Sequence, residues 1–158
     1  MKSRKPTLVI LVLLAVIAGL LYRFIIAGDT HPAPDGRSVV MLTPSERAQT
    51  LADMRDDVLA VQQIVQGLAN GDMRQIEAGA LPVGSKAMNR VGMQTLARLP
   101  YEYKQNDYGL HGDFDTIAIM AHQGKSTKTI QLKLADAMNR CISCHADYQL
   151  SAITLSKK

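Results

Sequence analysis

Residues 126–148 read STKTIQLKLADAMNRCISCHADY, and this stretch decides how the chain is expected to fold. Ser126 is a good N-cap residue, and apolar residues then recur every three or four positions, which is the spacing of one helix face. The residues on this predicted face are Ile130, Leu134, Ala137, Cys141, Cys144 and Tyr148. The stretch therefore predicts a long helix whose apolar face packs in a helical core.

The end of this helix carries Cys141-Ile142-Ser143-Cys144-His145, and the spacing C-x-x-C-H is the attachment pattern of haem c. In such a site two thiols add to the vinyl groups of a haem, and the adjacent imidazole binds its iron. Residues three and four apart share a helix face, so all three side chains can reach one ligand. The chain has 2 cysteines, and both lie in this motif. The sequence therefore predicts one covalent haem c, with His145 as the proximal iron ligand.

Three other kinds of site could also use this cysteine pair: a redox pair, a zinc site and a structural disulfide. A thioredoxin-like redox pair normally begins a helix in a βαβ setting, whereas Cys141 and Cys144 follow no β-rich region. A structural zinc site needs a fourth ligand and usually a second paired cluster, which the sequence does not offer. A disulfide between residues three apart closes too small a loop to stabilise the fold much. Haem attachment is therefore the preferred interpretation.

The N-terminal segment has the composition of an export signal. A basic cluster in residues 1–5 precedes an apolar run from Thr7 to Ala27 that only Arg23 interrupts. The run has about the 20 residues that cross a bilayer as a helix, and it is longer than the apolar core of a cleaved signal peptide. We therefore expect residues 1–27 to form an uncleaved transmembrane anchor, with a cleaved signal peptide as the alternative.

The charge pattern predicts where the parts of the chain lie. Positive charge before the apolar run favours a cytoplasmic N-terminus, which places the haem domain in the periplasm of a single-pass bacterial inner-membrane protein. Four of the 18 basic residues belong to the anchor, and residues 28–158 hold 14 basic and 14 acidic side chains. A domain without net positive charge does not indicate nucleic-acid binding.

Residues 28–42 are expected to form a linker, because His31-Pro32-Ala33-Pro34-Asp35-Gly36 predicts neither helix nor strand. The remaining residues, 43–158, are enough for one small core. No stretch alternates with period two for long enough to predict a sheet.

Three further helices are predicted between the linker and Ser126. Thr43-Pro44-Ser45-Glu46 is a capping box that begins the first helix, and Asn70-Gly71 ends it. Its apolar seam is Leu51, Met54, Val58, Val61, Val65 and Leu68. Asp72 caps the second helix, which Pro82 and Gly84 interrupt; its second part carries Met88, Val91, Leu96 and Leu99 and ends at Pro100.

Residues 101–107 are polar and aromatic and are expected to form a loop. The third helix follows with the apolar face Leu110, Phe114, Ile117 and Ala121, and it closes at Gly124. With the helix that Ser126 begins, the predicted fold is all-α, a four-helix bundle preceded by a single N-terminal transmembrane helix.

This arrangement resembles the cytochrome c prime superfamily, class II c-type cytochromes with C-x-x-C-H in the last helix of a four-helix bundle. The resemblance covers about residues 43–150 and rests on residues 141–145, on Ala146-Asp147-Tyr148 and on the helix count. His111-Gly112-Asp113-Phe114-Asp115 is similar to a His-x-x-Phe-Asp segment in the third helix of other bacterial c-type cytochromes. The resemblance implies thioether bonds at Cys141 and Cys144 and ligation by His145. Gln149 departs from the basic residue that members often have there.

The resemblance also implies that the sixth iron ligand comes from the first helix. A Met there suits electron transfer, whereas an apolar residue leaves the iron open to nitric oxide or carbon monoxide. Met54 lies on the predicted inward seam and is the candidate, although Met is also an ordinary core residue. His111 is the rival ligand, with Asp115 four residues on to orient its ring. Arg55 is a candidate partner for a haem propionate.

The expected function is that of a membrane-tethered, monohaem one-electron carrier in a bacterial respiratory chain. It would exchange electrons with a redox protein in the inner membrane or periplasm. Bundles of this type often pair into homodimers, but no residue in the sequence establishes a dimer. No catalytic residues are expected: a peroxidase-like site would want a distal acid–base pair, of which only His111 could offer half. The alternative is a five-coordinate haem protein that binds or detoxifies nitric oxide or carbon monoxide.

Overall fold

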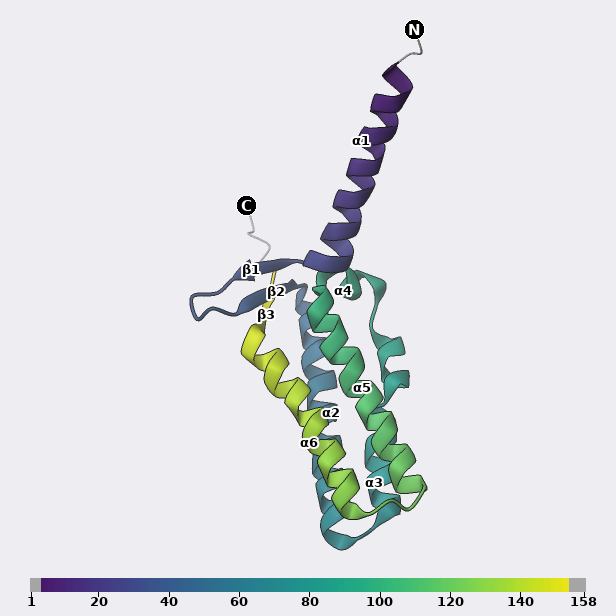
Figure 1. Cartoon of the computed structure of the whole chain (residues 1–158). Helices are drawn as coiled ribbons and strands as arrows, with labels where there is room; N and C mark the ends of the chain where they lie inside the picture. The colour runs from purple at the N-terminus through teal and green to yellow at the C-terminus, as the bar shows by residue number, and fades with distance from the viewer. Residues whose placement is uncertain (1–3, 154–158) are drawn as a thin grey trace.

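The computed structural model describes residues 4–153 and shows an apolar N-terminal helix that stands out from a mostly helical domain (Figure 1). The helix α1 (Arg4–Leu21) continues into the π-helical turns η1 (Tyr22–Ala27). The segment Pro6–Ala27 is long and apolar enough to cross a membrane, and its most apolar stretch is not buried against the domain. An apolar helix at the expected position is therefore confirmed.

The body of the domain consists of long helices joined by short turns. These elements are α2 (Pro44–Asn70), α3 (Met73–Ala80), α5 (Tyr101–His122) and α6 (Thr127–Asp147), with η2 (Leu81–Val83), η3 (Ser85–Arg90) and α4 (Met93–Arg98) between α3 and α5. In Figure 1, α4 lies at the end of the domain nearest to α1, whereas α3 lies near the opposite end. The mostly helical prediction is confirmed.

The predicted helix starts are present in the structure. Thr43 accepts a hydrogen bond from the Glu46 N–H at 3.3 Å, and the Glu46 carboxylate accepts one from the Thr43 N–H at 2.7 Å. Asp72 accepts from the backbone N–H groups at the start of α3, and Ser126 accepts from the Thr129 N–H. Each cap satisfies backbone donors that a helix start leaves unpaired, which explains why the sequence located these starts.

The expected loop at residues 101–107 is wrong, because these residues form the first two turns of α5. Pro100 precedes the helix with extended backbone, and Glu102 places a negative charge in the first turn, where the helix dipole favours it. Tyr103 is buried against Val40, Leu42, Leu99 and Tyr148. This tertiary burial outweighs the polar composition on which the expectation of a loop rested.

The sequence predicts no strand in residues 28–42, and this prediction is also wrong. Residues 30–32 form β1 (Thr30–Pro32), residues 38–42 form β2 (Ser38–Leu42), and both belong to a three-stranded sheet. In this sheet β2 pairs antiparallel with β1 and parallel with β3 (Tyr148–Ala152). Val40 and Leu42 point to the same face of β2, and both side chains are fully buried. The segment is therefore folded onto the domain, and the last helix ends at Asp147 rather than continuing through Tyr148.

The main core lies between α2, α3, α5 and α6. The predicted faces of α5 and α6 are confirmed, since Leu110, Phe114, Ile117, Ala121, Ile130, Leu134 and Ala137 are all buried. On α2 the prediction is wrong in part, because Val58 and Val65 are 69% and 50% exposed, whereas Ala60, Ile64 and Gly67 are buried.

The face that α2 turns toward the core differs from the predicted face, and this difference has a steric cause. A Cβ on Gly67 would lie 2.7 Å from Cγ1 of Ile76, so the missing side chain lets α3 pack directly on α2. The core side of α2 therefore combines Ile64 with the small residues Ala60 and Gly67, and part of the predicted apolar seam points out of the core.

Candidate haem-binding site

Cys141 and Cys144 lie in the last two turns of α6 and are free, partly buried thiols. Cys141 packs against the main core, and Cys144 packs against the second cluster, which consists of Val40, Leu42, Leu99, Tyr103 and Tyr148. His145 and Ile142, on the same two turns, are exposed. The motif is thus at the surface of the domain with both sulfur atoms turned toward the inside.

The protonation of these thiols argues against a thioredoxin-like pair. Burial, together with the nearby Asp57 carboxylate, raises the pKa of Cys141 above its ordinary value. Burial and the charge of Asp107 raise the pKa of Cys144 to about 12. Redox-active pairs depend on a thiolate with a lowered pKa, so these neutral thiols lack that property.

Met54 lies on α2 and is partly buried. It packs against the same second cluster as Cys144, although the two residues are 90 positions apart in the chain. The structure therefore brings the candidate sixth ligand and the predicted attachment motif to one cluster. Arg55, the candidate propionate partner, is exposed.

His111 is 5% exposed, and its ring is fixed by the η2 segment rather than by Asp115. Nδ1 lies 2.6 Å from the Val83 carbonyl oxygen, and because a carbonyl only accepts, Nδ1 carries the proton. Nε2 lies 3.8 Å from the Asp107 carboxylate. Asp115, expected to orient the ring, instead accepts a hydrogen bond from the Ser85 N–H at 3.0 Å. His111 and Asp115 thus both tie α5 to the connection that follows α3.

A cavity of about 40 Å³ separates Met54 from His111. Its lining also includes Asp53, Asp57, Met88, Leu99, Tyr103 and Asp107. The volume suits a water or a diatomic molecule and is far too small for a porphyrin. The acidic and aromatic side chains that line this cavity come from α2 and α5, and they are not neighbours in the sequence, so the sequence did not indicate that they lie together.

The acidic side chains around this cavity are poorly solvated. Burial raises the pKa of Asp57 to about 6, against the opposing effect of His111 and with the support of the Asp107 charge. Burial likewise raises the pKa of Asp107. At neutral pH the site therefore holds carboxylates whose ionisation is costly.

This cost predicts that Asp57→Asn stabilises the protein at neutral pH. The ordinary Asp pKa is 3.8, so well below that pH the carboxyl is protonated in both folded and unfolded states, and near pH 4 the change still has only a small effect. The increase in the free energy of unfolding grows as the pH rises toward 6. Above pH 6 it reaches about 1–2 kcal/mol, allowing for the partial exposure of the carboxyl group. Urea unfolding at pH 4 and pH 7.5 measures it. Asp56→Asn, at the exposed neighbouring position, should show no such pH-dependent gain.

A groove between α2 and α6 is large enough for part of a flat apolar group. It has a volume of about 420 Å³, and its lining residues are Val65, Leu68, Ala69, Thr127, Gln131, Leu134, Ala135 and Met138. Val58 lies two turns before Val65 on the same side of α2, and Cys141 lies one turn after Met138 on α6. Since these neighbouring helices run in opposite directions (Figure 1), the groove leads along exposed apolar side chains toward the cysteines.

The residue types present here are those that covalent haem attachment uses. Two thiols face inward, an imidazole follows them, and Val58 and Ile142 leave apolar surface uncovered on the two helices that flank the groove. Such surface is unfavourable in water and is the kind that a bound apolar group covers. Within residues 4–153, the motif included, no three or more His, Cys, Asp and Glu side chains are grouped so as to hold a metal ion by themselves.

Next to the motif, Arg140 takes part in a clamp between α5 and α6. Asp113 is buried on α5 and accepts hydrogen bonds from Arg140 Nε at 2.7 Å and from Lys133 Nζ at 2.5 Å. Burial opposes ionisation of Asp113, but these two partners outweigh it and hold the pKa of Asp113 below its ordinary value. The clamp fixes the turn of α6 that begins the motif.

Comparison of the chain with models of known protein families, with curated proteins and with solved structures finds no match.

Proposed function

We propose that this chain is a membrane-tethered monohaem c-type cytochrome of the class II kind, in which α2, α3, α5 and α6 act as the four-helix bundle that holds the haem. The observation that carries the proposal is the placement of C-x-x-C-H: both thiols turn inward on the last helix, beside apolar surface on α2 that nothing covers. A C-x-x-C-H sequence that arose by chance on a solvated surface would not be expected to lie beside exposed apolar side chains.

Each residue of the proposed site has one role. Cys141 and Cys144 would form the thioether bonds, and His145 would be the proximal ligand of the iron. The haem would supply one-electron exchange at its iron, and the protein would tune it through ligation and burial. Met54 is the proposed sixth ligand, because it packs against the same cluster as Cys144. His111 remains the rival ligand, with its Nε2 facing the cavity that Met54 also lines.

The proposed location follows from the N-terminal helix. With Pro6–Ala27 across the inner membrane and the basic residues 2, 4 and 5 in the cytoplasm, the haem domain lies on the periplasmic side. The proposed partner is a redox protein of the same membrane or of the periplasm. Tethering raises the effective concentration of the carrier near a membrane-bound partner.

One observation favours a second candidate function, the binding of nitric oxide or carbon monoxide. The cavity of about 40 Å³ between Met54 and His111 can accept a diatomic molecule, and it lies beside the cluster that Cys144 contacts. In that case Met54 would be a core residue, and the sixth position of the iron would be open.

The optical spectrum of the purified full chain in detergent, recorded with and without carbon monoxide, distinguishes the two functions. The electron carrier predicts a low-spin spectrum that carbon monoxide does not change. A high-spin spectrum that shifts when carbon monoxide is added would replace the carrier by the gas-binding protein. A chain without any haem absorbance would contradict both.

A further inference from the structure

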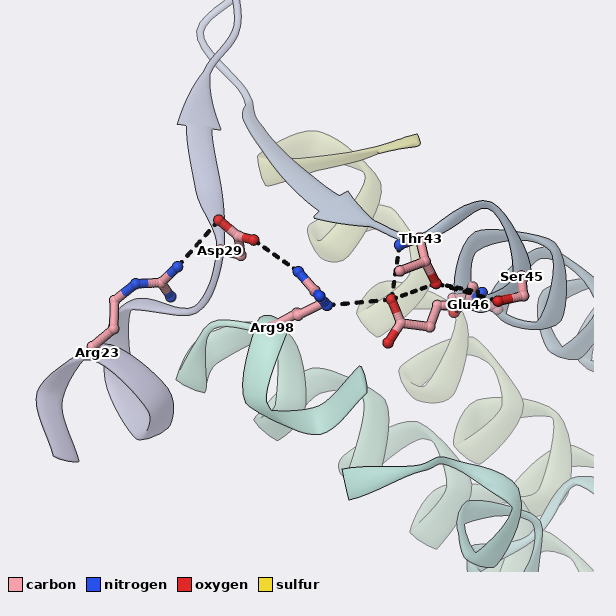
Figure 2. A network of polar contacts seen from close by, with 7 residues as sticks. Arg23, Asp29, Thr43, Ser45, Glu46 and Arg98 are labelled. Carbon is pink, nitrogen blue, oxygen red and sulfur yellow. Dashed lines mark hydrogen bonds and ion pairs between the residues drawn. The ribbon is translucent and has the colours of Figure 1, made fainter. Parts of the chain in front are cut away.

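A network of charged side chains joins the N-terminal helix to the domain (Figure 2). The Arg23 guanidinium lies 3.2 Å from one oxygen of Asp29, and the Arg98 guanidinium lies 3.0 Å from the other. Arg98 also lies 3.3 Å from the carboxylate of Glu46, which belongs to the capping box of α2. A single chain of contacts thus connects η1, the start of β1, α4 and the start of α2.

Hydrogen bonds and a close backbone approach also hold this junction together. The Asp29 N–H donates to the Arg98 carbonyl oxygen at 2.6 Å, and Lys104 Nζ donates to the Ile25 carbonyl oxygen at 2.9 Å. Gly28 has a φ of 65°, and a Cβ there would lie 2.5 Å from the Arg98 oxygen and from the Pro100 nitrogen. Only glycine fits this approach, so the helix is not attached to the domain by a free linker.

The length of the apolar segment places this junction at the membrane surface. The 22 residues of Pro6–Ala27 span about 33 Å as a helix, against about 30 Å for the hydrocarbon core. Gly28, which touches the α4–α5 connection, therefore lies at the level of the lipid headgroups. Near it Met93, the first residue of α4, is 79% exposed, and Tyr101, the first residue of α5, is also exposed. Tyr is favoured at this depth, where its ring is apolar and its hydroxyl is hydrated.

We infer that α4 and the first turn of α5 form a lipid-contacting surface that holds the domain in one orientation on the bilayer. The partner is the lipid surface itself, because this face continues directly from the apolar helix.

This orientation has a consequence for electron transfer. Leu99, which follows α4, packs in the same second cluster that Cys144 and Met54 contact. The candidate haem site therefore lies at the membrane-proximal end of the domain. This consequence rests on the proposed function, whereas the lipid-contacting surface requires only that the N-terminal helix spans a bilayer. A redox partner embedded in the same membrane is then better placed than a soluble one.

The chain has no Trp, so a single introduced Trp reports its own depth. The full chain carrying Met93→Trp is reconstituted in vesicles of phosphatidylcholine and phosphatidylglycerol, with and without brominated acyl chains. The ratio of the two emissions cancels any constant quenching by haem. Emission is expected to fall at least roughly twofold in the brominated vesicles, as for a Trp at the interface. The control is Gln123→Trp, at the far end of α5, which should keep its emission.

The role of the junction is tested in the Met93→Trp background. Gly28→Ala should abolish the quenching, because its Cβ separates η1 from α4. Gly36→Ala is the matched control, since Gly36 also has a positive φ of 87° but has nothing within 4 Å of an added Cβ. Arg98→Ala, compared with Arg90→Ala at an exposed position on η3, tests the ion pairs if Gly28→Ala does not fold.

Equal emission in the two lipids for a membrane-bound Met93→Trp protein would overturn the inference, as would equal quenching at positions 93 and 123. Unchanged quenching in both Gly28→Ala and Arg98→Ala would show that the junction does not set the orientation. None of these results depends on haem, so the spectrum described above can support the cytochrome while this surface fails, or the reverse.

Discussion

Replacing Met54 with alanine is expected to convert the haem from a low-spin form that ignores carbon monoxide into a high-spin form that binds it. The change removes the thioether sulfur, the only atom of the Met54 side chain that can bind iron. The methyl group of alanine cannot be a ligand. Met54 packs against the second cluster from α2 and Cys144 packs against it from α6, so the loss opens space beside the cluster that Cys144 contacts. The optical spectra of the ferric and ferrous forms, with and without carbon monoxide, measure the conversion.

Two variants make this result specific. Met93→Ala changes a Met that is 79% exposed and does not pack in the second cluster, so it should leave the spectrum unchanged. His111→Ala should preserve the low-spin spectrum if Met54 is the ligand, and should convert it if His111 is the ligand. A Met54→Ala protein with an unaltered spectrum would remove Met54 from the iron.

Replacing Phe114 with alanine is expected to lower the free energy of unfolding by about 3–5 kcal/mol. Phe114 is fully buried at the centre of the main core, between residues of α2, α3 and α6. The loss combines the apolar area removed with the cavity left behind, since a packed core relaxes only in part. Urea unfolding followed by circular dichroism measures the change.

Ile119→Ala is the control for this prediction, because Ile119 lies on the same helix but is 56% exposed. Its expected effect is below about 1 kcal/mol, as for most surface substitutions, with a small gain in helix propensity. Equal losses in the two variants would show that α5 does not pack through the face that the structure gives it.

The parts of the fold that the sequence predicted are those encoded locally. The faces of α5 and α6 follow from large apolar residues three and four apart, and the helix starts follow from side chains that cap their own backbone. The core side of α2 could not be found in this way. Its buried residues are Ala60, Ile64 and Gly67, and the small size of Gly67 matters only because α3 packs against it.

The sheet was missed for a different reason. Its strands have three to five residues, and β2 pairs with β3 more than 100 positions along the chain. Such short segments show no reliable alternation, and Pro32 ends β1 at the edge of the sheet, where a missing N–H is tolerated. The pairing becomes favourable only when α6 brings its C-terminal end beside Val40 and Leu42.

In the candidate site, too, the features that neighbouring residues encode could be predicted from the sequence, whereas those that depend on tertiary packing could not. The spacing of Cys141, Cys144 and His145 is local, so the motif could be found from the sequence and its inward-facing thiols follow from the helix period. The buried carboxylates Asp57 and Asp107 could not, because their burial depends on how α2 and α5 meet. The same holds for the Arg23–Asp29–Arg98 contacts at the junction.

Covalent attachment of haem through Cys141 and Cys144 is tested by the intact mass of the full chain, produced in a bacterial host that can mature c-type cytochromes. The expected mass is that of the polypeptide plus one haem, retained after acid extraction of non-covalent haem, with neither Cys141 nor Cys144 open to a thiol reagent. The bare polypeptide mass with two reactive thiols would contradict it.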